Sequence, residues 1–76
     1  MKNLSINPND IRTTSFWTIA EPSSEYKLPT TYGVLISFLI GGSYPMLQIV
    51  YDRSSASVWH RTADANWNWS EWFRKQ

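Results

Sequence analysis

The chain has no cysteine and only one histidine among its 76 residues. The absence of cysteine excludes disulfides, and with a single histidine it also excludes the usual structural zinc sites. A domain of this size buries only about 60% of the surface of its unfolded chain. We therefore expect it to depend on aromatic packing, on oligomerisation or on attachment to a larger protein.

The sequence also lacks an excess of one charge and a long apolar run. Seven Lys and Arg balance six Asp and Glu, without the basic stripe that follows nucleic-acid phosphates, so no nucleic-acid partner is expected. Residues 32–40 are the most apolar run, but a membrane helix needs about 20 residues. This run predicts a buried strand and no membrane insertion. Met1-Lys2 is followed by polar residues, so no export signal is expected.

The chain is rich in tryptophan, with five among its 76 residues. Four of its five tryptophans lie between Trp59 and Trp72. Side chains this large are seldom left on the surface of a small protein. The cluster is therefore either the core of a small β domain or a stacking platform for a ligand.

Short runs rich in aromatic and β-branched residues predict strands, separated by turn signals about every ten residues. The expected strands are residues 15–19, residues 32–40, a strand from residue 44 or 46 to residue 51, and residues 57–62 and 72–74. Helical periodicity is nowhere sustained. We predict a mainly β fold, a small twisted antiparallel meander of four or five strands with little helix. Residues 1–14 are expected to be a linker or lead-in, and residues 15–76 the β domain.

The strand expected at residues 32–40 is apolar on both faces. Val34, Ile36 and Phe38 share one face, and Leu35 and Leu39 share the other. A strand buried on both sides is central or interfacial. Because so short a chain cannot cover both faces, the pattern predicts an oligomer.

Gln48 and Arg61 lie in neighbouring expected strands. They could bind a ligand, but we favour a structural interpretation, in which Gln48 bonds across the sheet while the Arg61 guanidinium stacks on Trp72 or Trp67. Trp59 and Trp72 are assigned structural roles as well.

Trp67 stands between Asn66 and Asn68, just after an expected turn. An aromatic ring flanked by amides suits a sugar, because the ring packs on C–H groups while the amides bond to hydroxyls. Tyr44, beside the Gly41-Gly42-Ser43 turn, is the other aromatic expected on a loop. We predict that Trp67, Asn66, Asn68 and Tyr44 bind carbohydrate, although Trp67 could equally cover the core.

No catalytic arrangement is visible. His60 has no neighbouring nucleophile or second metal ligand, and the six carboxylates show no spacing typical of a glycosidase pair. The sequence predicts a non-enzymatic protein without metal or cofactor.

Several segments follow one another in a characteristic order and spacing. They are Asn9-Asp10 leading into Thr13-Thr14-Ser15-Phe16-Trp17-Thr18-Ile19, then Tyr32-Gly33-Val34-Leu35, Gln48-Ile49-Val50-Tyr51, Val58-Trp59-His60-Arg61 and Trp67-Asn68-Trp69-Ser70-Glu71-Trp72-Phe73. Together they resemble the pyocin-knob modules of phage tail fibres and of phage-tail-like bacteriocin fibres, and the resemblance covers residues 9–74. One departure is Ser15, where the family usually has glycine.

The resemblance implies a β-rich knob on a trimeric fibre, located in the phage tail of the virion. The leading hypothesis is a non-enzymatic module of a tail fibre or tail spike that aids host attachment by binding bacterial surface glycan. Its other partners would be upstream fibre or spike domains and further copies in a homotrimer. One alternative is a structural module that trimerises or caps the fibre. Another is an accessory domain of a capsule-degrading tail spike whose chemistry lies upstream.

Overall fold

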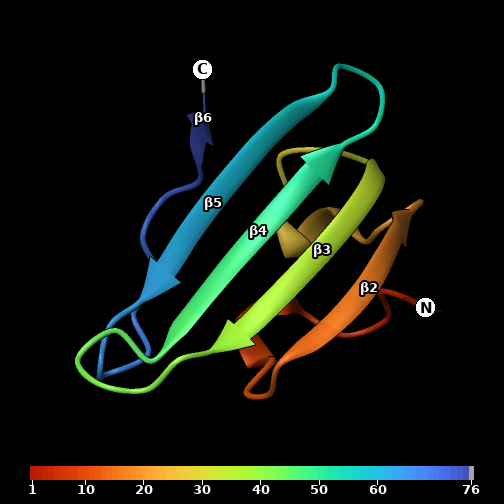
Figure 1. Ribbon diagram of the computed structural model, residues 1–76. Coiled ribbons are helices and arrows are strands. Elements are labelled where there is room, and N and C mark those ends of the chain that lie inside the picture. The colour runs from red at the N-terminus through yellow and green to blue at the C-terminus, as the bar shows by residue number, and fades with distance from the viewer. Residues whose placement is uncertain (76) are drawn as a thin grey trace.

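The computed structural model describes residues 1–75, which form one six-stranded sheet in the order β1-β2-β3-β4-β5-β6 (Figure 1). The strands are β1 (Lys2–Asn3), β2 (Ser15–Ala20), β3 (Tyr32–Leu39), β4 (Met46–Asp52), β5 (Ser57–Ala63) and β6 (Phe73–Lys75). Two single-turn 3-10 helices, η1 (Pro8–Asp10) and η2 (Ser24–Tyr26), lie between the early strands. The predicted mainly β fold is confirmed. The sheet has six strands rather than four or five, and it is mixed because β1 runs parallel to β2.

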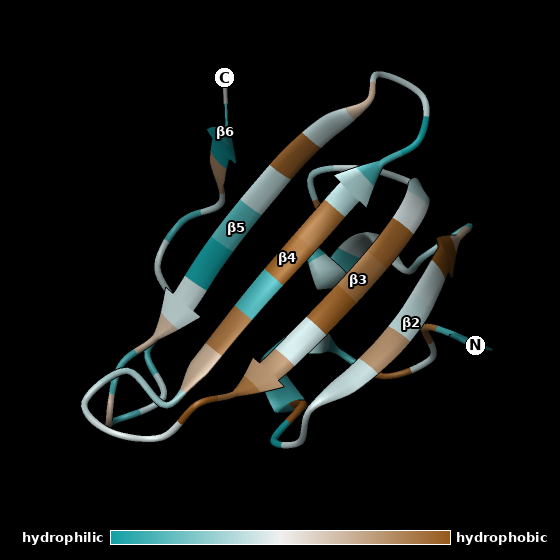
Figure 2. Cartoon of the chain, viewed as in Figure 1, coloured by the Kyte–Doolittle hydropathy of each residue, from teal (hydrophilic) through white to brown (hydrophobic). Residues whose placement is uncertain are grey.

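β3 and β4 form the apolar centre of the sheet. They pair from Gly33 with Asp52 to Leu39 with Met46, and Figure 2 shows both strands hydrophobic over most of their length. The turn between them passes through Gly41 and Gly42, whose φ angles of 75° and 78° strain any residue with a Cβ. The two glycines therefore let the chain reverse at this point.

One face of the sheet, which we call the covered face, carries the core. The N-terminal segment and the loop containing η2 lie behind the sheet in Figure 1. The buried apolar side chains are Leu4, Ile11, Ile19, Leu35, Met46, Val50 and Ala63, and the half-buried tryptophans pack against them.

The first fourteen residues belong to this core and do not behave as the expected linker. Leu4 is 4% exposed and Ile11 is 2% exposed. The Leu4 N–H donates to the Thr18 carbonyl oxygen at 2.8 Å, continuing the pairing of β1 with β2. The segment contributes separated apolar side chains and not a regular element, so no periodicity in the sequence reveals its role.

The opposite face of the sheet is open. No segment among residues 1–75 crosses it, and in Figure 1 it faces the viewer without a covering layer. The C-terminal segment packs on the covered face instead. The backbone of Trp69 pairs with that of Ala63, and β6 then pairs with the edge of β5. Residues 1–75 thus form one sheet with its covering layer on one side.

Candidate functional site

Gln48 and Arg61 are adjacent on β4 and β5, and both side chains are buried on the covered face. Arg61 Nε donates to Gln48 Oε1 at 2.9 Å. Gln48 Nε2 donates to the Pro8 carbonyl oxygen at 2.8 Å and to Ser37 Oγ at 3.2 Å. The Gln48 amide therefore links two strands to the N-terminal segment, so its bonding groups are used inside the fold.

The Arg61 guanidinium lies against two indole rings. Its Cζ is 4.1 Å from the Trp69 ring centroid and 4.6 Å from that of Trp72. Trp67, the other ring considered for this stacking, lies instead against Arg12. Burial of Arg61 lowers the pKa of its guanidinium to about 10. Attraction between a cation and aromatic faces, which strengthens when both are desolvated, offsets part of the cost of burial.

Several donors in this cluster have no acceptor. Arg61 Nη2 and the indole Nε1 atoms of Trp59 and Trp72 are buried without a hydrogen-bond partner. Each such donor is costly to bury. The half-buried rings of Trp59 and Trp72 nevertheless pack against the core. The cluster therefore fastens the C-terminal segment to the sheet.

The loops that carry the predicted carbohydrate-binding residues leave the sheet at the same end. Met46 pairs with Ala63, so the loop after β3, which carries Tyr44, and the loop after β5, which carries Asn66 and Asn68, leave the sheet side by side (Figure 1). The Tyr44 side chain is 60% exposed. Both asparagines are exposed, and their backbone N–H groups donate to Asp64 Oδ1 at 2.9 and 3.0 Å. Their side-chain amides thus lie on a loop held by Asp64.

Trp67 is less available than these neighbours. Its ring is half-buried against the core, and the Arg12 Cζ lies 4.0 Å from the ring centroid. One ring face is thereby occupied by a cation from the N-terminal segment. The backbone of Trp67 has a φ of 62°, which is unusual for a residue with a Cβ. Nothing in the sequence around Trp67 signals the contact with Arg12, which is 55 residues away.

The open face is an apolar surface built by five strands. Side chains alternate along each strand, and the register fixes which of them share this face. The open face comprises Phe16, Thr18, Ala20, Tyr32, Val34, Ile36, Phe38, Leu47, Ile49, Tyr51, Val58, His60, Thr62, Phe73 and Lys75.

A continuous row crosses the middle of the open face. It runs through Phe16, Ile36, Ile49, His60 and Phe73, each paired with the next across neighbouring strands. The His60 and Phe73 rings have centroids 5.8 Å apart. Phe16 is 53% exposed and Phe73 is 52% exposed, so both ends of the row offer large apolar side chains to solvent.

Charge is almost absent from the open face. Among its residues only Lys75 carries a full charge, at the edge strand, and none is acidic. The Arg53 guanidinium approaches the face at one end, where its Cζ lies 4.8 Å from the Tyr32 ring centroid. In the sequence, residues 28–51, which contain β3 and all of β4 except Asp52, have no charged side chain. The sequence indicated a second apolar face on β3, but it did not show that Phe16 and Phe73 extend that face to the outer strands.

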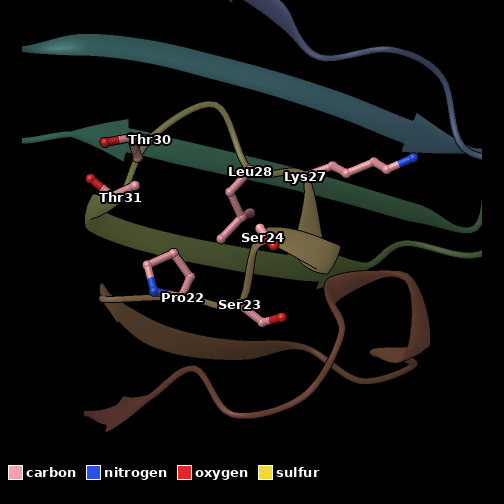
Figure 3. A pocket seen from close by; sticks show the side chains of 7 residues that line it. All are labelled: Pro22, Ser23, Ser24, Lys27, Leu28, Thr30 and Thr31. Carbon is pink, nitrogen blue, oxygen red and sulfur yellow. The ribbon is translucent and has the colours of Figure 1, made fainter.

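A shallow pocket of about 300 Å³ lies elsewhere, around η2 (Figure 3). It is lined by Pro22, Ser23, Ser24, Lys27, Leu28, Thr30 and Thr31. The hydroxyls of Ser23 and Thr30 already accept backbone N–H groups of Glu25 and Tyr32. The Lys27 side chain extends away from Leu28 in Figure 3. The pocket includes none of the predicted carbohydrate-binding residues.

Residues 1–75 contain no group of three His, Cys, Asp or Glu side chains placed to hold a metal ion. Within the same part of the chain, no helix has the length and apolar character needed to cross a membrane. Comparison with protein-family models, with curated proteins and with solved structures found no match for this chain.

Proposed function

We propose that this chain is a non-enzymatic structural module, which joins a fibre-like assembly by packing its open face against protein. The observation that carries the proposal is the open face itself, an almost uncharged apolar sheet surface with exposed Phe16, Tyr51 and Phe73. Contiguous exposed apolar patches of this kind usually mark interaction sites. The resemblance to tail-fibre knobs is the source of the fibre context.

We favour the structural role over a role in which Trp67 stacks on a sugar, because the open face is more exposed than the Trp67 ring. Trp67 is half-buried and has Arg12 against one side of its ring. Tyr51 and Phe16 are 42% and 53% exposed and lie on a face shared by five strands. Hydrophobic stabilisation follows the apolar area removed from water, so the open face has more to gain from a partner.

The test measures the yield of assembled fibres from a phage or bacteriocin whose genes encode this chain. Ile49→Lys places a charge at the centre of the open face and is expected to reduce the yield of assembled fibres. Ile40→Lys makes the same change on an exposed loop, where Ile40 is 61% exposed, and should leave the yield unchanged. Normal assembly with Ile49→Lys would refute the structural role.

Glycan binding at the loop end is a second candidate, favoured by the exposure of Tyr44, Asn66 and Asn68 on two loops that leave the same end of the sheet. An exposed tyrosine ring and two exposed amides are groups that recognise a sugar. Tyr44→Ala should then weaken adsorption of the isolated chain to host cells and binding on a glycan array. Tyr32→Ala is the matched control, because it removes an exposed tyrosine at the opposite end of β3. Equal binding by both variants and the wild type would exclude Tyr44 from a site.

A further inference from the structure

We propose that the partner of the open face is another copy of this chain, whose own open face packs against it. This inference deepens the proposed function and rests on it, because it names what covers the surface.

The exposed apolar area is enough for a weak interface between two copies. Phe16, Tyr51 and Phe73 are 53%, 42% and 52% exposed. Because each aromatic side chain has about 200 Å² to bury, these three leave about 300 Å² uncovered. The half-buried aliphatic residues raise this to roughly 500 Å² for each copy, so two faces would bury roughly 1,000 Å², near the lower limit for a specific interface.

The charge distribution suits self-association better than a charged partner. With no acidic residue, and with Lys75 and the Arg53 guanidinium only at its margins, the face offers little to attract a strongly charged protein. Two copies can approach without bringing like charges together at the centre, where Ile36 and Ile49 lie. A neutral apolar face is therefore complementary to itself.

The composition of the sheet edges indicates that two copies meet through the open face and not by pairing their edge strands. Lys2 lies on the outer strand β1, and Arg74 and Lys75 lie on the outer strand β6. Both edge strands are short. Short strands bearing basic residues are the usual protection against edge-to-edge pairing.

Sheets with one apolar face are ordinarily completed by a second sheet. Two twisted sheets pack about 10 Å apart with their side chains interdigitated and their strands within about 30° of one another. A second copy supplies a sheet of matching twist and size. In this arrangement the row from Phe16 to Phe73 would lie in the buried layer, and the association would give the small domain a second core.

The experiment measures the mass of the whole chain in solution by light scattering and by sedimentation, from low to high micromolar concentration. The wild type should form a concentration-dependent dimer, because face-to-face packing uses the one open face of each copy. Phe16→Lys and Ile49→Lys should each weaken its association constant about tenfold or more, because a lysine charge would be buried. Ile40→Lys, a matched change on the exposed loop, should leave association unchanged.

Folding of each variant is checked by circular dichroism, and Phe16→Lys serves as the test if Ile49→Lys does not fold. A wild type that remains monomeric throughout would overturn the inference. So would an oligomer that dissociates as readily with Ile40→Lys as with Phe16→Lys. If the chain is monomeric but Ile49→Lys still blocks fibre assembly, this inference fails while the structural role stands. If assembly is also normal, both fail.

Discussion

Arg61 Nε donates a hydrogen bond of 2.9 Å to Gln48 Oε1 on the covered face. These two side chains are the centre of a chain of contacts, which we call the relay. Gln48 extends this relay to the Pro8 carbonyl oxygen, and Arg61 extends it to the rings of Trp69 and Trp72. The pair therefore holds the N-terminal and C-terminal segments on the same side of the sheet. Among residues 1–75, no segment covers the opposite face.

Arg61→Lys is expected to lower the free energy of unfolding by about 1–3 kcal/mol. Lysine has no planar guanidinium to stack on two indoles while donating to Gln48, and it leaves Gln48 Oε1 buried without a donor. Urea unfolding followed by tryptophan fluorescence measures the change. Arg74→Lys, on the exposed strand β6, is the control and should have almost no effect. Equal stability of the Arg61 variant and the wild type would show that the relay contributes little.

Trp72→Ala should destabilise the domain by about 3 kcal/mol, because it removes a large side chain that packs on the core and on Arg61. Phe73→Ala provides the comparison, since the neighbouring aromatic lies on the open face and is 52% exposed. In a monomeric sample, Phe73→Ala should lower the free energy of unfolding much less than Trp72→Ala does. Thermal melts of both variants at low concentration report the difference. A melting temperature within a few degrees of wild type for Trp72→Ala would remove Trp72 from the core.

Gly33→Ala is expected to prevent normal pairing of β3 with β4. A Cβ at this position would overlap the backbone carbonyl oxygen of Tyr51, which cannot move without breaking the register. Gly42→Ala has free space around its Cβ and suffers only from its positive φ, which costs about 1 kcal/mol. The dispersion of amide signals in an NMR spectrum distinguishes the two. A well-folded Gly33→Ala protein would contradict the close approach of these strands.

Because of Asp52, we expect the free energy of unfolding to fall slightly in acid. A hydrogen bond from Ser55 Oγ, with a further one from the Ser54 backbone N–H, lowers the pKa of this carboxyl below its ordinary value of 3.8. A lowered pKa in the fold means that this stability is present above pH 3.8 and is lost as the pH falls through the folded value. Unfolding curves at a series of acidic pH values should show this dependence in the wild type. Asp52→Asn should lack that component, and identical pH profiles would exclude it.

The sheet was predictable because its strands have strong local signals. β-Branched and aromatic runs mark β2 to β5, and the Gly41-Gly42-Ser43 turn lies where the hairpin reverses. The role of residues 1–14 was not predictable. Leu4 and Ile11 reach the core from an irregular segment, so their burial depends on tertiary contacts and leaves no periodic pattern.

The candidate site was predictable only in part. Alternation along β4 places Ile49 and Tyr51 together, but the extension of that face to Phe16 and Phe73 depends on strand register. The cover on Trp67 comes from Arg12, a contact between distant parts of the chain. Pairings of this kind are set by the fold as a whole, and single-sequence patterns do not contain them.

Carbene labelling of the wild-type chain, read out residue by residue at low and at high protein concentration, tests the role of the open face most directly. Tyr51 and Tyr44 serve as internal comparisons in the same sample, since both are exposed tyrosines but only Tyr51 belongs to the open face. The account predicts that Tyr51, Phe16 and Phe73 become protected as the concentration rises, while labelling of Tyr44 stays constant. Unchanged labelling of Tyr51 and Phe16 at all concentrations, or protection at Tyr44 alone, would contradict it.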